Sequence, residues 1–260
     1  MPKIDELRVS VDTTLLDEVV RFHARGRVPS HERIFGTTMY PGYDPATVSR
    51  YEFGEYEFSP VAPENIPLAP STEVPAALRR SGSVRSFSNR PVPFGVLSSL
   101  IDAALCARDE TGRRHYPSGG GLYPIEAFIV PLHAESVEGL ALCNYRVLAK
   151  TRALEVVAPV PRHLSDVLFR APMNQPTRPS FAIVYAAHLE RCVVKYRYRG
   201  YRNALIEAGA IVQQVGLCAE ALGLGSVPWA WFDDYEISKL LGLSPTRLPL
   251  VTMQLIGYPA

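Results

Sequence analysis

One stretch, from Lys195 to Gly225, constrains the fold of this chain more than any other. Apolar residues recur in it at three- and four-residue spacing, which predicts a helix from about Ala204 to Leu222. Asn203 suits the N-cap of this helix, and Gly223 suits the residue that ends it. Several residues away from the apolar stripe are also uncharged: Ala210, Ile211, Gly216, Leu217 and Cys218. We therefore expect a buried helix with other elements packed on several of its sides.

An aromatic and basic cluster precedes this helix. It alternates tyrosines with cations: Lys195, Tyr196, Arg197, Tyr198, Arg199, Tyr201 and Arg202. Such a cluster at the mouth of a buried helix indicates a functional site. The alternative is structural, because cations that flank a helix are usually solvated and tyrosines usually pack with the hydroxyl in water.

The composition limits the class of protein. A chain of 260 residues forms one large domain or two small ones, and its 27 basic and 26 acidic residues nearly cancel. This balance gives no signal for binding nucleic acid or an anionic membrane. The cysteines are widely spaced without a C-x-x-C pair, so we expect neither a disulfide framework nor a metal site. The N-terminal residues lack a signal-peptide pattern and no apolar run approaches about 20 residues, which predicts a cytoplasmic protein without a membrane span.

Two parts of the chain differ in character. Residues 1–70 hold a possible amphipathic helix at 5–23, followed by a tract rich in aromatic residues and proline. We expect an arm that packs on the main body or on a partner subunit. Residues 71–260 form the main domain, with helices expected at 74–80, 93–107, 162–169 and 234–241. Strands are expected at 125–132, 140–145, 154–157, 181–187 and 250–256, with a strand or loop at 226–231, which together predict an α+β fold.

Two loops are candidates for binding a ligand. The turn at Ser81 to Ser88 offers hydroxyls and Arg85 around a glycine, which suits a phosphate, although an ordinary polar loop has a similar composition. The run Ser118 to Gly121 lets the backbone approach a flat or anionic ligand, and the tyrosines and prolines at both ends argue against a flexible loop. This run lacks the lysine of a Walker loop and the G-x-G-x-x-G spacing of a nicotinamide fold.

Four blocks together resemble the nitroreductase superfamily of flavin enzymes, and within it the SagB-type dehydrogenases of thiazoline and oxazoline rings. The matching blocks span about residues 75–258: SVRSF (Ser83–Phe87), PSGGGLYPIEAFIV (Pro117–Val130), KYRYRGYRNALIEAG (Lys195–Gly209) and EALGLGSVPWAWFDD (Glu220–Asp234). The second and third blocks are specific to this branch. The resemblance implies an α+β fold with a mixed sheet flanked by helices, in an entwined homodimer that holds FMN at its interface.

The resemblance also implies roles for individual residues. Ser83 and Arg85 are expected at the phosphate and ribityl end of FMN. Backbone amides near Ala230 and Trp231 are expected to donate to the edge of the flavin. A further group is expected to lie along the isoalloxazine ring: Pro117, Ser118, Gly119 and Gly120.

Lys195 and Tyr196 are the implied catalytic pair. Converting thiazoline to thiazole removes a hydride, which flavin takes, and a proton, which needs a base; oxygen then reoxidises the flavin. Free lysine and tyrosine have pKa values near 10.4 and 10, so a neighbouring cation or burial must lower the pKa of the base. Which of the two side chains is the base stays open.

Two features depart from the family pattern. Ser81 and Gly82 stand where the family usually has an Arg-Arg pair, which here lies two residues earlier at Arg79 and Arg80. The bulky Trp229 and Trp231 could narrow the pocket, stack on the substrate or pack the core.

Three hypotheses of function remain. The first is an oxidase of azoline rings in a peptide or carrier-bound intermediate, working beside a cyclase partner. The second is an NAD(P)H-dependent reductase of nitro compounds or quinones, and the third is a flavin-free scaffold subunit of a biosynthetic complex. The Lys195–Tyr196 pair favours the first hypothesis, because a reductase needs no base for a carbon acid.

Overall fold

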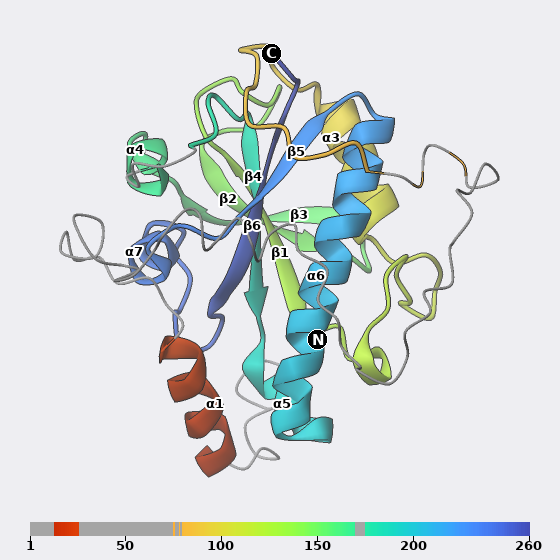
Figure 1. Ribbon diagram of the computed structural model, residues 1–260, viewed down its shortest axis with the longest axis vertical. Helices are drawn as coiled ribbons and strands as arrows, with labels where there is room; N and C mark the ends of the chain where they lie inside the picture. Colours follow the sequence, from red (N-terminus) through yellow and green to blue (C-terminus); the bar gives the residue numbers. More distant parts are fainter. Residues whose placement is uncertain (1–12, 26–74, 76–77, 79, 170–174) are drawn as a thin grey trace, which may run out of the picture. The chain divides into compact units, whose positions relative to one another are not determined.

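The computed structural model describes residues 13–25, 75, 78, 80–169 and 175–260 of the chain (Figure 1). Residues 1–30 and 79–260 form one compact unit, and residues 31–78 form another. Most of the predicted arm at 1–70, and most of the helix predicted at 74–80, lies outside the described residues. The arm therefore stays a prediction, and the first unit carries everything that follows.

The described residues contain a six-stranded sheet with the order β3-β2-β1-β4-β6-β5. Its strands are β1 (Ile125–Pro131), β2 (Cys143–Leu148), β3 (Ala153–Pro159), β4 (Phe181–Ala187), β5 (Gly225–Trp229) and β6 (Leu250–Gly257). Neighbouring strands of this sheet pair antiparallel, and parallel pairing in the described part occurs at the isolated bridges Ser86–Thr177 and Val92–Val137. The predicted α+β class is confirmed, with a sheet that is antiparallel in its strand pairs.

The central strand β4 is buried on both faces, as its apolar sequence predicts. Ile183 and Tyr185 enter the core on one side, and Val184 and Ala186 enter the core on the other. This alternation follows from the two-residue period of a strand. β4 therefore separates two layers of helices.

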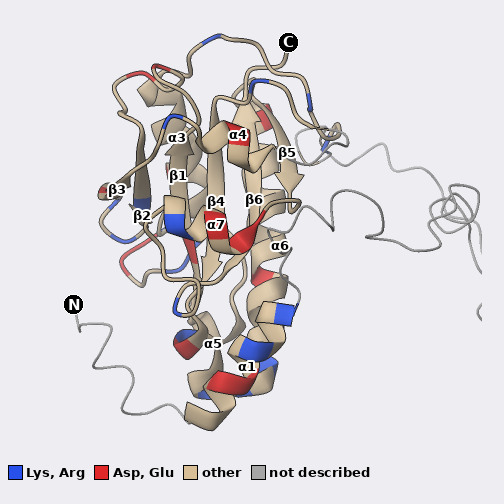
Figure 2. Ribbon diagram, turned by 90° about the vertical axis from the view of Figure 1, so that its left-hand side faces the viewer, with Lys and Arg blue, Asp and Glu red and all other residues tan. Residues whose placement is uncertain are grey.

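Helices cover both faces of the sheet (Figure 1). They are α1 (Thr13–Arg25), α3 (Phe94–Leu105), α4 (Leu164–Leu168), α5 (Leu189–Tyr196), α6 (Tyr198–Ala221) and α7 (Asp234–Leu240). Residues of α1, α3, α5 and α6 share one core, whereas residues of α4 and α7 share the other. The side view shows α4 and α7 in front of the strands, with α6 behind them (Figure 2).

The start of α6 differs from the prediction. The helix begins at Tyr198 rather than at Ala204, so Asn203 lies inside it and is not its N-cap. The preceding α5 ends at Tyr196, and Arg197, with φ of 51°, turns the chain between the two helices. Gly200 permits this tight junction, because a Cβ there would lie 1.8 Å from the carbonyl oxygen of Cys192. A close approach of two backbones, which helix-capping rules do not consider, sets the true boundary.

The helix α6 is only partly covered within one chain. It packs against α3, α5 and β5. On its other side Tyr198, Leu205 and Ile206 are 54%, 40% and 64% exposed. Among the described residues, α6 is the one helix with the length and composition to cross a membrane, but its packing on the sheet is that of a core helix.

The predicted hairpin at 140–145 and 154–157 has shifted bounds. The first strand runs later, as β2, and the second extends beyond both predicted ends, as β3, around a turn in which Arg152 has φ of 54°. The other predicted strands and helices of the main domain agree with the observed elements to within a few residues.

Candidate functional site

The second and third sequence blocks meet in the structure. We call Pro117–Pro124 the glycine block. Gly120 has φ of 66°, and a Cβ built on it would lie 2.5 Å from Oη of Tyr196. A Cβ on Gly119 would lie 2.9 Å from Nδ2 of Asn203. Only glycine allows this backbone to lie so close to the two side chains.

Lys195 and Tyr196 are the last residues of α5 and lie next to each other at the edge of the glycine block. Nζ of Lys195 is 5.3 Å from the centre of the Tyr196 ring, within the range of a cation–π contact. Lys195 is exposed and Tyr196 is half-buried. The pair thus presents an ammonium and a phenol side by side, with the phenol against Gly120 of the glycine block.

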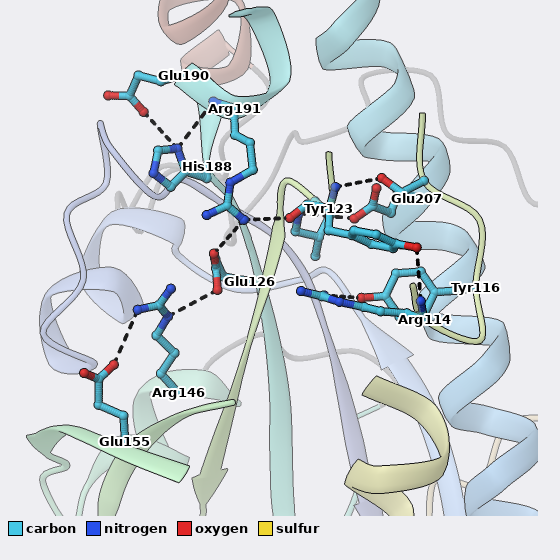
Figure 3. A network of polar contacts seen from close by, with 12 residues as sticks. Arg114, Tyr116, Tyr123, Glu126, Arg146, Glu155, His188, Glu190, Arg191 and Glu207 are labelled. Carbon is cyan, nitrogen blue, oxygen red and sulfur yellow. Dashed lines mark hydrogen bonds and ion pairs between the residues drawn. The ribbon is translucent and has the colours of Figure 1, made fainter. Parts of the chain in front are cut away.

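Aromatic side chains fix both ends of the glycine block. The guanidinium of Arg114 lies 4.7 Å from the centre of the Tyr123 ring and donates to the hydroxyl of Tyr116. The backbone amide of Arg114 donates to the hydroxyl of Tyr123 at 3.0 Å, and the two tyrosine rings meet edge to face (Figure 3). These contacts hold the two ends of the block, as the expectation of stiff ends requires.

An ion-pair network joins α5 to the glycine block and the sheet (Figure 3). Arg191 donates to the carbonyl of Tyr123 at 2.8 Å and pairs with Glu126 at 3.0 Å. Glu126 also pairs with Arg146 at 3.2 Å. Burial opposes the ionisation of Glu126, but Arg146 and Arg191 outweigh it and hold its pKa below the ordinary value. The network therefore ties the helix that carries Lys195 and Tyr196 to β1.

The sequence analysis missed two residues of α6, Asn203 and Glu207, that face the glycine block. They lie four positions apart, so they occupy one face of the helix. Oε1 of Glu207 accepts the backbone amide of Ile125 at 3.3 Å. Burial raises the pKa of Glu207 to about 6, while the nearby hydroxyl of Ser118 opposes the rise. Their four-residue spacing in the third block indicated that both lie on one face of the helix, but it did not indicate which segment that face would contact.

The first block lies at the other end of α6. The backbone amide of Ser81 donates to both carboxylate oxygens of Glu220, at 3.3 and 3.2 Å. The guanidinium of Arg80 donates to Oγ of Ser83 at 2.8 Å, so an arginine reaches this serine although it stands earlier in the sequence than the family pattern has it. Ser83 and Arg85 are exposed. A cavity of about 250 Å³ lies beside this segment, with walls from α6 and β5.

Ala230 and Trp231 follow β5. Ala230 is exposed, and Trp231 is half-buried and packs against the core on the side of α4 and α7. Trp229, which was a candidate for the pocket wall, is 8% exposed and its ring lies 6.2 Å from that of Phe169. Trp229 therefore packs the core, and its Nε1 has no hydrogen-bond partner among the described residues.

The candidate residues fall into separate groups within one chain. Pro117 to Gly120 lie with Lys195 and Tyr196 near Asn203, whereas Ser83 and Arg85 lie near Glu220. Asn203 and Glu220 are separated by 17 positions of α6, or about 25 Å at a rise of about 1.5 Å per residue. One chain therefore does not bring all the predicted cofactor-binding residues together. In the described part of the chain, no cluster of three or more histidine, cysteine or acidic residues is placed to hold a metal ion.

Comparison with known proteins places this arrangement in context. A model of the Nitroreductase family matches residues 78–258. The microcin B17-processing protein McbC of Escherichia coli is 30% identical over 249 residues, which are 95% of this chain and 91% of McbC. The putative nitroreductase MJ1384 of Methanocaldococcus jannaschii is 30% identical over 173 residues, covering 66% of this chain and 84% of that protein.

Solved structures agree with the sequence comparisons. A chain of the Escherichia coli microcin synthetase McbBCD complex with truncated pro-MccB17 bound superposes with a TM-score of 0.89 at 29% identity, covering 100% of this chain and 98% of that one. A putative nitroreductase of Ralstonia eutropha superposes with a TM-score of 0.60 at 22% identity, covering 75% of this chain and 88% of its own, and shares the fold.

Proposed function

Because this chain belongs to the nitroreductase family, we propose that it is an FMN-dependent oxidoreductase that converts thiazoline or oxazoline rings of a peptide natural product to thiazole or oxazole. One observation carries the proposal: Tyr196, with Lys195 beside it, packs against Gly120 in a glycine block whose Gly120 and Gly121 are exposed. The similarity to McbC, named as a microcin B17-processing protein, supports a peptide substrate.

The reaction has a defined balance of hydrogen. Two adjacent ring carbons each lose one hydrogen, one as a hydride and one as a proton, and become doubly bonded to each other. FMN, when bound, supplies the acceptor of the hydride and is restored by molecular oxygen. The Lys195–Tyr196 pair takes the proton: one side chain accepts it from the ring carbon and the other orients that base. A reductase has no carbon acid to deprotonate, so the pair favours oxidation.

The residues present suit FMN. Gly120 and Gly121 are exposed, so their backbone offers a surface that a flat ring can approach, and the contacts of Arg114 with Tyr116 and Tyr123 hold the ends of the block. Ser83 and Arg85 are exposed, and Arg80 brings a second guanidinium to Ser83, which together suit a phosphate. Ala230 and Trp231 are proposed to supply backbone amides to the edge of the ring.

We further propose a homodimer that holds FMN at its interface. The two groups of residues lie at positions about 25 Å apart along α6, which supports a site that two copies of the chain complete together. The exposed Leu205 and Ile206 on α6 supply apolar surface for such an interface. The similarity to the McbBCD complex supports association with a cyclase partner, and we expect the protein in the cytoplasm.

The test combines cofactor analysis with turnover. Purified protein should release FMN on heating, and the loaded protein should oxidise an azoline peptide. Lys195→Ala and Tyr196→Phe should each lower kcat by about 10²- to 10⁴-fold while keeping FMN. Matched controls are Lys150→Ala and Tyr235→Phe, which alter exposed residues away from the block. Wild-type protein that binds no FMN, or variants as active as the controls, would contradict the proposal.

The same preparation distinguishes the reductase. The similarity to a Thermus thermophilus protein named NADH dehydrogenase, 26% identical over 190 residues, makes this comparison worthwhile. Rapid bleaching of the flavin absorbance by NADPH, without azoline oxidation, would favour the reductase. We expect slow bleaching by NADPH and fast bleaching by the azoline peptide under anaerobic conditions.

A further inference from the structure

Glu207 is a buried carboxylate to which the proposed chemistry gives no part. It lies on α6, one helical turn after Asn203, and is only 2% exposed. Oε1 accepts the amide of Ile125, whereas Oε2 is buried and has no hydrogen-bond partner among the described residues. A buried carboxylate without an ion pair is unfavourable, so a leucine would be the simpler residue for packing alone.

Charged and titratable groups face Glu207 from the elements packed around it. Arg114 and Tyr116 come from the segment before the glycine block, and Arg191 and Cys192 come from α5. Burial raises the pKa of Glu207 to about 6, and the side chain of Ser118, the amide of Ile125 and the two arginines oppose the rise. The carboxylate is therefore charged above about pH 6, in contact with the segment that it faces.

Glu207 lies between the two ends of the glycine block. Ser118 forms the first turn of the block, because its carbonyl accepts the amide of Gly121 at 3.1 Å and its hydroxyl accepts the amide of Tyr123 at 2.8 Å. Ile125 follows the block directly and begins β1. The carboxylate is thus beside the start of the block and bonded to the residue after its end.

We propose that Glu207 is a positioning residue, which anchors both ends of the glycine block and so sets the place of Gly120 against the phenol of Tyr196. Its charge matters because a carboxylate accepts the hydrogen bond of the Ile125 amide more strongly than a neutral group does, and because the nearby side chain of Ser118 favours the charged form. An apolar residue would fill the space but leave the amide of Ile125 without its partner. The proposal rests on the proposed function only in assigning Tyr196 to catalysis.

The first test is hydrogen–deuterium exchange of the cofactor-free protein, because it needs neither FMN nor a substrate. In Glu207→Leu we expect the amides of Gly121, Tyr123 and Ile125 to exchange about tenfold faster, since each hydrogen bond lost makes local opening easier. Glu207→Gln keeps the shape and should show a smaller increase in the same peptide. The control is Glu138→Gln, the same chemical change at an exposed carboxylate. Unchanged exchange in residues 118–125 of either folded Glu207 variant, with β4 still protected, overturns the proposal.

The second test asks whether Glu207 acts through Tyr196. Glu207→Gln should lower kcat about tenfold or more with little change in KM, because a misplaced catalytic group mainly affects the chemical step. Combined with Tyr196→Phe, it should cost no further activity. Losses that multiply in the double variant contradict a role through Tyr196. If the wild-type protein does not oxidise azolines, the proposed function fails, while the exchange experiment still decides whether Glu207 anchors the block.

Discussion

Replacing Gly120 with alanine tests the contact on which the proposed site depends, and the neighbouring glycine is a matched control. Gly120 and Gly121 have nearly the same backbone, with φ of 66° and 68°. A Cβ on Gly120 would lie 2.5 Å from Oη and 2.9 Å from Cε2 of Tyr196, whereas a Cβ on Gly121 would meet nothing within 4 Å. The two alanine variants therefore share the backbone strain and differ in the contact with Tyr196.

The magnitudes follow from these two contributions. The left-handed backbone costs an alanine about 1–2 kcal/mol, partly offset by about 0.4–1 kcal/mol from the lower entropy of its unfolded chain. This sum applies to both variants. Overpacking against Tyr196 adds about 1–3 kcal/mol in Gly120→Ala alone. For a chain of this size each kcal/mol lowers Tm by about 2–4 °C, so Gly120→Ala should melt about 2–12 °C below Gly121→Ala.

Turnover should separate the variants further. A displacement of Tyr196 by about 1 Å is expected to lower kcat by about 10²-fold in Gly120→Ala, while Gly121→Ala keeps most of its activity. Adding Tyr196→Ala should abolish the difference in Tm between the two glycine variants, because the obstructing side chain is gone. Equal Tm and equal kcat in the two alanine variants would refute the contact.

Three further predictions follow from the ion pairs, the buried carboxyl and the exposed helix face. Arg191→Met should lower the free energy of unfolding by about 1.5–3 kcal/mol in urea titrations at pH 7, because Glu126 loses one of its two arginine partners and keeps Arg146. That loss should shrink in acid, since the pKa of Glu126 is lowered in the folded state and its contribution disappears as pH falls through that value; a constant loss down to pH 3 would contradict it. Glu207 has a raised pKa, so relative to Glu207→Gln the wild-type protein should gain about 1 kcal/mol of stability as the pH falls from 6 to 4.5, and equal pH slopes would argue against a buried charge. Ile206→Glu should yield monomers by light scattering that no longer retain FMN, and a dimer that keeps FMN would exclude α6 from the interface.

Much of the fold could be predicted from local pattern. The unbroken apolar run of β4 predicted burial on both faces, and the apolar patterns of α3 and β1 predicted their positions to within two residues. These predictions succeeded because each depends on residues that are neighbours in the sequence. The contacts at the ends of the glycine block are also local, since Arg114 contacts both Tyr116 and Tyr123, and all three residues lie within ten positions of one another in the sequence.

The errors arose where distant segments meet. The start of α6 is set by the approach of Gly200 to the carbonyl of Cys192, and no capping rule contains that contact. Asn203 was assigned to the N-cap and Glu207 was overlooked, because their contacts depend on which segment lies across from α6. Likewise, the shifted arginine pair cast doubt on the first block, but the structure shows that the side chain of Arg80 is long enough to reach Ser83.

The length of α6 has a consequence for how a substitution in one chain affects the two sites of the proposed dimer. Suppose that each FMN site takes its phosphate-binding residues from one chain and its glycine block from the other. One chain alone then forms no complete site, and each chain contributes half of both sites in the dimer. A chain altered in both its phosphate-binding residues and its glycine block would then disturb both sites of its dimer. If one chain is altered in its phosphate-binding residues and its partner in the glycine block, both substitutions fall in one site and the other site stays intact. The activity of a dimer would then depend on which two chains combine in it, and not on either chain alone.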